Sequence, residues 1–126
     1  MKILVVDDSS VIRKIIKASI DVLKMETIEA KDGKEALEIL SDMQNEISLV
    51  LLDWNMPEIS GYEVLVEIKN NPKYKGIPVM MVTTEGQKSN IVAAVKAGAV
   101  NYLTKPFTGV ELEEKILECI GEEGEI

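Results

Sequence analysis

The chain has 126 residues, of which 46% are hydrophobic and 29% charged, so it can form one good core but not a second ordinary domain. Its formal net charge is −8 and it has no block of basic residues. These features argue against nucleic-acid binding and against anionic membranes, both of which attract clusters of Lys and Arg. The single cysteine, Cys119, excludes an internal disulfide.

Short apolar runs alternate with longer amphipathic stretches along the chain, which is typical of βαβ units with a parallel sheet. The first run, residues 3–6, predicts a strand, and a helix follows it with Ser9 or Ser10 as the N-cap. Apolar residues at helical spacing predict the buried face of this helix: Ile12, Ile15, Ile16, Ile20 and Leu23.

The next two units follow the same pattern. A weaker strand at residues 27–30 leads to a helix over residues 33–43, with Asp32 and Glu35 as a capping box. A third strand at residues 49–52 is followed by a helix that ends before Pro72. Ser60 and Glu63 cap this third helix, and its predicted inner face contains Val64, Leu65 and Ile68.

Two further units complete the predicted domain. A strand at residues 79–82 precedes a helix over residues 88–97, and Gly98 is suited to a left-handed residue at its end. The apolar contacts predicted for this fourth helix are Ile91, Val92 and Val95. The last strand contains Tyr102 and Leu103, and the fifth helix begins at Thr108 with Glu111 in its capping box. Its predicted inward residues are Leu112, Ile116 and Ile120.

The ends of the chain complete the predicted organisation. We expect the domain to cover residues 1–120 and an acidic, glycine-containing tail at residues 121–126 to fray. The sequence has no signal-peptide pattern, and no apolar run approaches the roughly 18 residues of a membrane span. The expected location is therefore the cytoplasm.

Residue types suited to an aspartyl-phosphate site stand at the ends of these predicted strands. Asp7 and Asp8 follow the first strand, Asp53 the third, Thr83 the fourth, and Lys105 comes soon after the fifth. Because the carboxyl ends of parallel strands meet at one edge of a sheet, we expect these side chains to lie together. Three clustered carboxylates repel one another, and a hard divalent cation such as Mg²⁺ relieves that repulsion.

Each of these residues has a distinct chemical use. An ionised Asp53 can attack phosphorus as the nucleophile. Lys105 supplies a positive charge that pairs with Asp53 before the reaction and with a phosphoryl oxygen afterwards, and the Thr83 hydroxyl can donate to another phosphoryl oxygen. The bond from Lys105 to Pro106 is a candidate cis peptide.

The same motifs resemble the receiver domain of two-component response regulators, from Lys2 to about Ile120. They are the paired acids after the first strand, the segment DWNMP at residues 53–57 running to Gly61, Thr83 after the fourth strand, and the segment KPF at residues 105–107. The strings DWNMP, MVTTEGQKSNI and KPFT are most similar to stand-alone chemotaxis regulators of that family. The resemblance implies a single α/β domain, a doubly wound (βα)5 flavodoxin-like fold whose five-stranded parallel sheet has the order 2-1-3-4-5.

The resemblance also implies a metal set and a switch. Asp8 and Asp53 would ligate Mg²⁺ directly, Asp7 mainly through water, and the backbone carbonyl of Asn55 would supply another ligand. On phosphorylation, Thr83 would move toward the phosphoryl group and Tyr102 would turn inward. The face made by the fourth helix, fifth strand and fifth helix would then change.

The implied function is a phosphorylation-activated signalling switch, expected to be monomeric, that catalyses only its own phosphorylation and dephosphorylation. A histidine kinase of the chemotaxis type would donate the phosphoryl group. A flagellar switch protein or another target would bind the altered face. The residues expected to contribute to that docking are Lys88, Asn90, Val95 and Tyr102.

The resemblance implies that three residues flank the path by which water or a phosphatase would approach the acyl phosphate: Asn55, Thr84 and Glu85. By analogy with the family, we expect them to tune the lifetime of the phosphoryl group. Thr84 departs from the pattern, because it is bulkier than the small residue usual at this position.

Other functions fit the sequence less well. A phosphorelay intermediate, which passes its phosphoryl group to a histidine phosphotransfer protein, needs the same core residues and stays open as the alternative. A dehalogenase-like phosphatase would end its first strand on D-x-D, whereas this strand ends on Asp7-Asp8-Ser9. Nucleotide-binding folds would show a glycine-rich turn that is absent here. A receiver-like scaffold that only binds protein would lack a core acid or the lysine, and none is lost.

Overall fold

A single five-stranded parallel sheet forms the centre of the computed structural model, which describes residues 1–121. Its strands are β1 (Lys2–Val6), β2 (Glu26–Ala30), β3 (Ile47–Leu52), β4 (Val79–Thr83) and β5 (Asn101–Thr104), and they lie in the order β2-β1-β3-β4-β5. The predicted strand order is confirmed. Of the predicted tail at residues 121–126, all but Gly121 lies outside the described residues.

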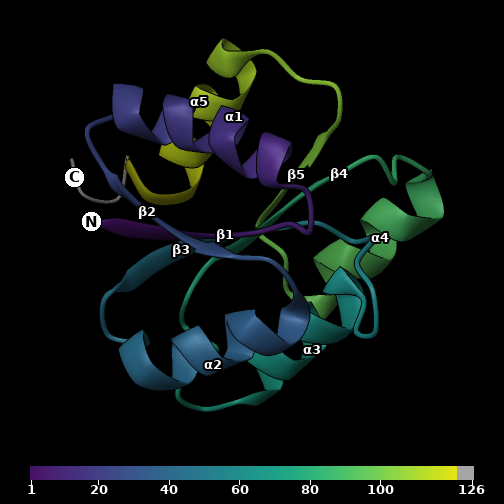
Figure 1. Cartoon of the computed structure of the whole chain (residues 1–126). Helices are drawn as coiled ribbons and strands as arrows, with labels where there is room; N and C mark the ends of the chain where they lie inside the picture. Colours follow the sequence, from purple (N-terminus) through teal and green to yellow (C-terminus); the bar gives the residue numbers. More distant parts are fainter. Residues whose placement is uncertain (122–126) are drawn as a thin grey trace.

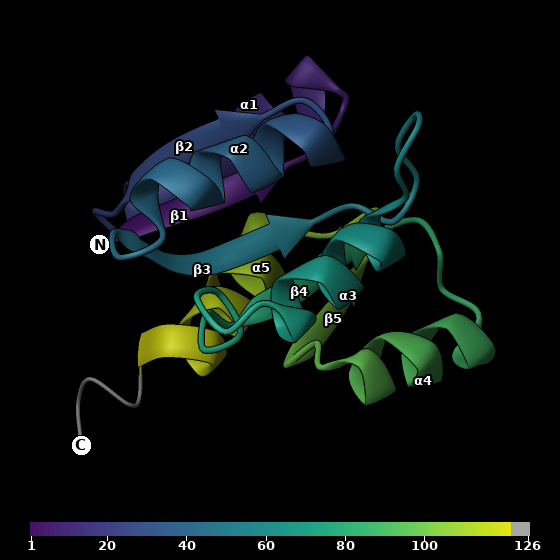
Figure 2. The ribbon, with the colours of Figure 1, turned by 90° about the horizontal axis from the view of Figure 1, so that it is seen from below.

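Helices cover both faces of this sheet (Figure 1). They are α1 (Ser10–Val22), α2 (Gly33–Met43), α3 (Gly61–Asn70), α4 (Lys88–Ala97) and α5 (Gly109–Ile116), and α5 continues into a π-helical turn, η1 (Leu117–Gly121). Helices α1 and α5 lie on one face, whereas α2 and α3 lie on the other and α4 follows at the β5 end (Figures 1 and 2). Within residues 1–121, no helix combines the length and the apolar character that crossing a membrane requires.

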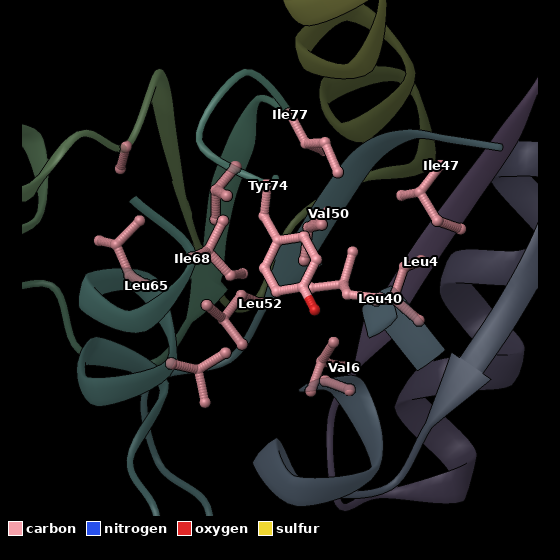
Figure 3. Close-up of a cluster of buried hydrophobic side chains, with 14 of the residues drawn as sticks. Leu4, Val6, Leu40, Ile47, Val50, Leu52, Leu65, Ile68, Tyr74 and Ile77 are labelled. Atoms are coloured by element: carbon pink, nitrogen blue, oxygen red, sulfur yellow. The ribbon is translucent and has the colours of Figure 1, made fainter. Parts of the chain in front are cut away.

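Two hydrophobic cores, one on each face, fix the strands in place. Successive strand residues point to opposite faces, so Ile3 and Val5 join the core under α1 and α5, whereas Leu4 and Val6 join the core under α2 and α3. Figure 3 shows the second of these cores, with the ring of Tyr74 in its middle. Strands buried on both faces read as continuous apolar runs, which is why the sequence located them well.

The predicted helix caps are largely present. Ser9 caps α1, and complete capping boxes join Ser60 to Glu63 and Thr108 to Glu111. Gly98 ends α4 with φ +114°, the left-handed conformation that favours glycine.

The capping box predicted for α2 is formed only in half. The Asp32 side chain accepts from the Glu35 amide at 2.8 Å, but the Glu35 carboxylate accepts from the Lys31 amide instead of that of Asp32.

The predicted inner faces of α3 and α5 are buried, but three residues of α1 and α4 that were also predicted to be buried are exposed. Ile15 of α1 is 48% exposed, and Val92 and Val95 of α4 are 41% and 55% exposed. The buried residue of α4 is Ala94. Figure 2 shows the reason for α4, which lies at the end of its layer beside the edge strand β5 and so has little of the sheet beneath it.

Gly61 provides a test of how tightly α3 packs against the loop after β3. A Cβ atom at this position would lie 1.9 Å from the Asp53 carbonyl oxygen, and the Gly61 amide donates to the Trp54 carbonyl at 2.8 Å. We predict that Gly61→Ala lowers the free energy of unfolding by about 1–3 kcal/mol, measured by urea denaturation, because the backbone must move.

Gly76→Ala is the matched control, since a Cβ atom there would meet nothing within 4 Å. Its free energy of unfolding should stay within about 0.5 kcal/mol of the wild type or rise slightly. Equal stability of the Gly61 and Gly76 variants would contradict the close approach of α3 to Asp53.

Candidate functional site

Sheet register brings the three acidic residues together. Asp7 follows β1 and Asp53 follows β3, and these strands are neighbours whose last residues, Val6 and Leu52, are paired. Asp7 and Asp53 are buried, with 2% and 6% of their surface exposed, while Asp8 is exposed. One carboxylate oxygen from each of the three acids lies within 4.8 Å of the others. The predicted acidic cluster is therefore present at the carboxyl edge of the sheet.

Lys105 reaches this cluster from the loop after β5. Its Nζ lies 2.7 Å from Asp7 Oδ2 and 3.5 Å from Asp53 Oδ2, so the shorter ion pair is with Asp7 and not with the expected partner Asp53. The Lys105 amide donates to the Thr83 carbonyl at 2.9 Å, and the bond to Pro106 is cis, as predicted. The ammonium group thus lies between two buried carboxylates.

Backbone amides hold the two buried carboxylates in position. The Ser9 amide donates to Asp7 Oδ1 at 2.9 Å, and the Asn55 amide donates to Asp53 Oδ1 at 3.3 Å. In each acid the other oxygen, Oδ2, is the one that contacts Lys105. Both carboxylates are therefore oriented before any ligand binds.

The electrostatic environment disfavours the ionised form of Asp53. Burial raises the pKa of its carboxyl group above the ordinary value, and the negative charge of Asp7 raises it further. The Thr83 hydroxyl, the Lys105 ammonium and the Asn55 amide favour the carboxylate but do not cancel the effect of burial. An added positive charge at the cluster would lower this pKa and favour the nucleophilic form.

The donor set suits a hard divalent cation. Carboxylate oxygens are the ligands that Mg²⁺ prefers, and it commonly binds through one or two carboxylates and keeps several waters. Asp8 offers an exposed carboxylate beside the two buried ones, so solvent reaches the cluster from one side. The acidic cluster can therefore bind a metal ion.

Thr83 and Tyr102 lie on the β5 side of the site. Thr83 is fully buried, and its Oγ1 accepts from the Glu85 amide at 3.3 Å. Tyr102 is half-buried, and its hydroxyl donates to the Glu85 backbone carbonyl. Burial, followed by the negative charges of Glu85 and Asp53, raises the pKa of Tyr102, so its hydroxyl keeps its proton and stays a donor.

The three residues predicted to flank the acceptor contact one another directly. Asn55 Nδ2 lies 3.2 Å from Glu85 Oε2 and 3.4 Å from Thr84 Oγ1. Asn90 of α4 adds a second amide, with its Nδ2 2.9 Å from Glu85 Oε1. The β3–α3 loop, the β4–α4 loop and α4 are thereby joined by side chains.

The residues expected to contribute to docking lie on α4 and β5. Lys88 and Val95 are exposed, whereas Asn90 and Tyr102 are half-buried. Asn90 was expected only as a docking residue, and its contact with Glu85 was missed because nothing in the local sequence links the two side chains.

Arg13 is a second contact that sequence reasoning missed. Its Nη1 donates to the Asp7 carbonyl oxygen at 2.7 Å, and its Nε pairs with Glu29 at 2.8 Å. In the sequence Arg13 resembles the other charged residues on the outer side of α1, so no signal distinguishes it. The contact fixes the backbone that carries the paired acids.

Comparisons with known proteins agree with this geometry. The response regulator receiver domain family matches residues 3–117. The chain is 43% identical over 122 residues to a chemotaxis protein CheY homolog of Campylobacter jejuni, covering 96% of this chain and 93% of the relative. It is equally identical to chemotaxis protein CheY1 of Helicobacter pylori, with coverage of 96% and 98%.

Comparison with solved structures also finds response regulators with the same fold. A response regulator receiver domain protein from Clostridium thermocellum superposes with a TM-score of 0.88 at 35% identity, covering 98% of this chain and 96% of that one. Chemotaxis protein CheY4 of Vibrio cholerae gives a TM-score of 0.87 at 29% identity, with coverage of 94% and 98%.

The raised pKa of Asp53 predicts a pH-dependent cost in stability. At pH values between the ordinary pKa of Asp and the higher pKa in the folded state, the folded protein binds the Asp53 proton more tightly than the unfolded chain does. The free energy of unfolding therefore falls as pH rises through that window. We predict that, with a chelator present, Asp53→Asn is more stable than the wild type at about pH 7 and that the difference shrinks toward about pH 4. Urea denaturation at a series of pH values measures both effects.

Asp42→Asn is the control, because Asp42 is an exposed residue of α2. At about pH 7 this variant should stay within about 0.5 kcal/mol of the wild type. A wild type that is more stable than Asp53→Asn at neutral pH would contradict the electrostatic account of the site.

Proposed function

The chain belongs to the response regulator receiver family, and from this premise we propose that it is a chemotaxis-type switch that accepts a phosphoryl group on Asp53. The observation that carries the proposal is the convergence of Asp7, Asp8, Asp53 and Lys105 at one edge of the sheet. The family is one of signalling proteins and not of classical enzymes. The only reactions proposed for the chain are its own phosphorylation and dephosphorylation.

The proposed phosphoryl donor is a histidine kinase of the chemotaxis type. A carboxylate oxygen of Asp53 attacks the phosphorus, the phosphorus–nitrogen bond of the phosphohistidine breaks, and the released nitrogen takes up a proton from solvent. The Lys105 ammonium, 3.5 Å from Asp53 Oδ2, supports this role, because its charge offsets part of the effect of burial and so favours the nucleophilic carboxylate. The Asn55 amide orients the attacking group.

Mg²⁺ is the cation that we propose for the acidic cluster. Asp8 and Asp53 would be direct ligands, Asp7 would act mainly through water, and the Asn55 carbonyl would supply another ligand. When bound, the cation neutralises charge on the acidic cluster and on the phosphoryl oxygens. The fit of three carboxylate oxygens within 4.8 Å supports this assignment.

Lys105 and Thr83 stabilise the phosphorylated form. Lys105 turns from its carboxylate partners to a phosphoryl oxygen, and the Thr83 hydroxyl donates to another. The movement of Thr83 alters the packing around Tyr102, whose hydroxyl is already bonded to the backbone of Glu85. The two residues thereby transmit phosphorylation to the surface.

The proposed output surface is the face made by α4, β5 and α5. Its target is a flagellar switch protein, with Lys88, Asn90, Val95 and Tyr102 contributing to docking. The exposed apolar side chains of Val92 and Val95 support the assignment, because they offer apolar surface to a partner. We expect the protein to be a cytoplasmic monomer and a phosphatase to act on it.

Asn55, Thr84 and Glu85 are proposed to set the lifetime of the phosphoryl group. Their mutual contacts support this role, since together they cover the approach from the β4–α4 loop. Thr84 is exposed, and its extra bulk narrows the same approach.

Labelling with acetyl phosphate tests the proposed function. We predict that the wild type with Mg²⁺ gains one phosphoryl group by intact-mass analysis and that fragmentation locates it on Asp53. Asp53→Asn should take no label, and chelation of Mg²⁺ should prevent labelling of the wild type. Asp42→Asn is the matched control and should label normally, because Asp42 lies on α2 away from the cluster.

Label that survives either Asp53→Asn or chelation would contradict the site assignment. The labelled protein can next be offered to a flagellar switch peptide and to a histidine phosphotransfer domain. Stronger binding of the peptide to the labelled form supports the chemotaxis switch. Loss of label to the phosphotransfer domain without peptide binding would favour the phosphorelay intermediate.

A further inference from the structure

Glu85 is the residue at which four parts of the fold meet. Its amide donates to the Thr83 hydroxyl, and its backbone carbonyl accepts from the Tyr102 hydroxyl. Its carboxylate accepts from Asn55 at 3.2 Å on one oxygen and from Asn90 at 2.9 Å on the other. The Glu85 side chain is therefore fixed at both oxygens, once by the β3–α3 loop and once by α4.

The first turn of α4 differs from that of the other helices. Side chains cap α1, α2, α3 and α5, but Gln87 makes no side-chain cap hydrogen bond to α4. Ala94 is the buried residue of α4, which lies beside α3 at the end of its layer (Figure 2). The Asn90 side-chain amide therefore links a weakly buried helix to Glu85 of the β4–α4 loop, and Glu85 in turn contacts Asn55 of the loop after Asp53.

We propose that Asn90 is a positioning residue for the aspartyl phosphate, which acts by holding the Glu85 carboxylate against the Asn55 amide. This inference rests on the proposed function, because it concerns the phosphoryl group on Asp53. It also makes the position of α4 a determinant of the phosphoryl lifetime. A partner that draws α4 outward breaks the contact between Asn90 and Glu85 and shortens that lifetime.

The reaction affected is hydrolysis of the acyl phosphate. A water oxygen attacks the phosphorus, the bond between phosphorus and the Asp53 oxygen breaks, and hydrogen phosphate, a proton and the Asp53 carboxylate are formed. Glu85 held by two amides stays beside Asn55 and restricts the approach of this water. Once released from Asn90, the carboxylate can swing away from the path and no longer obstructs the attacking water. Hydrolysis should therefore become faster.

Dephosphorylation rates of three α4 variants test the inference. After labelling and removal of acetyl phosphate, we expect Asn90→Ala to lose its label about threefold faster than the wild type, a change within the range of one net hydrogen bond. Asn90→Asp keeps the shape of the side chain but places a carboxylate against Glu85, so its rate should be at least as high. Ser89→Ala is the control, an exposed neighbour on the same helix, and should match the wild type.

A double-mutant cycle shows whether Asn90 acts through Glu85. In a Glu85→Ala background, Asn90→Ala should have no further effect on the rate. The inference is overturned if Asn90→Ala keeps the wild-type rate, if Asn90→Asp behaves like the wild type, or if the threefold effect persists without Glu85. The free energies of unfolding of all variants should stay within about 1.5 kcal/mol of the wild type, because the contact is one part-buried hydrogen bond outside the two cores.

The outcomes separate this inference from the function on which it rests. A wild type that takes no label overturns both. A wild type labelled on Asp53, with Asn90 variants that hydrolyse at the wild-type rate, overturns only the role of Asn90.

Discussion

Negative charge concentrated at one edge of the sheet is the constraint around which this protein is organised. Asp7 and Asp53 are buried side by side, Asp8 lies next to them, and the Lys105 ammonium reaches into the space between the two buried carboxylates. One lysine does not balance three carboxylates, so the cluster favours any ligand that brings positive charge. In the proposed reaction Asp53 becomes an acyl phosphate, a mixed anhydride, whose added negative charge the cation and Lys105 would offset.

The rest of the fold divides into a part that fixes this cluster and a part that responds to it. Strands β1 and β3, buried on both faces, hold the acids at a set spacing, and Arg13 and Gly61 pin the loops that carry them. Helix α4 shares little of this packing and is tied to the site through Asn90 and Glu85. A change at the acceptor can therefore reach α4 without disturbing the cores, which suits a switch with its output surface on that side.

The sequence predicted the strands, the helix bounds and the acidic cluster because each depends on a local signal: an apolar run, a capping pair, or an acid directly after a strand. The strand order came from family resemblance. Periodicity failed at Ile15, Val92 and Val95, because apolar spacing does not reveal how much of the sheet lies beneath a helix. The contacts of Arg13 with Asp7 and of Asn90 with Glu85 depend on how loops turn, and residue type alone does not predict them.

The central claim is that Lys105 and a divalent cation share the same carboxylates, and calorimetric titration of Mg²⁺ into the wild type and Lys105→Gln tests it most directly. Gln is one atom shorter than Lys, but it keeps N–H donors and removes the charge. The account predicts tighter Mg²⁺ binding by Lys105→Gln, because a competing positive charge has left Asp7 and Asp53. Equal or weaker Mg²⁺ binding by the variant would show that the lysine and the cation do not meet at one site.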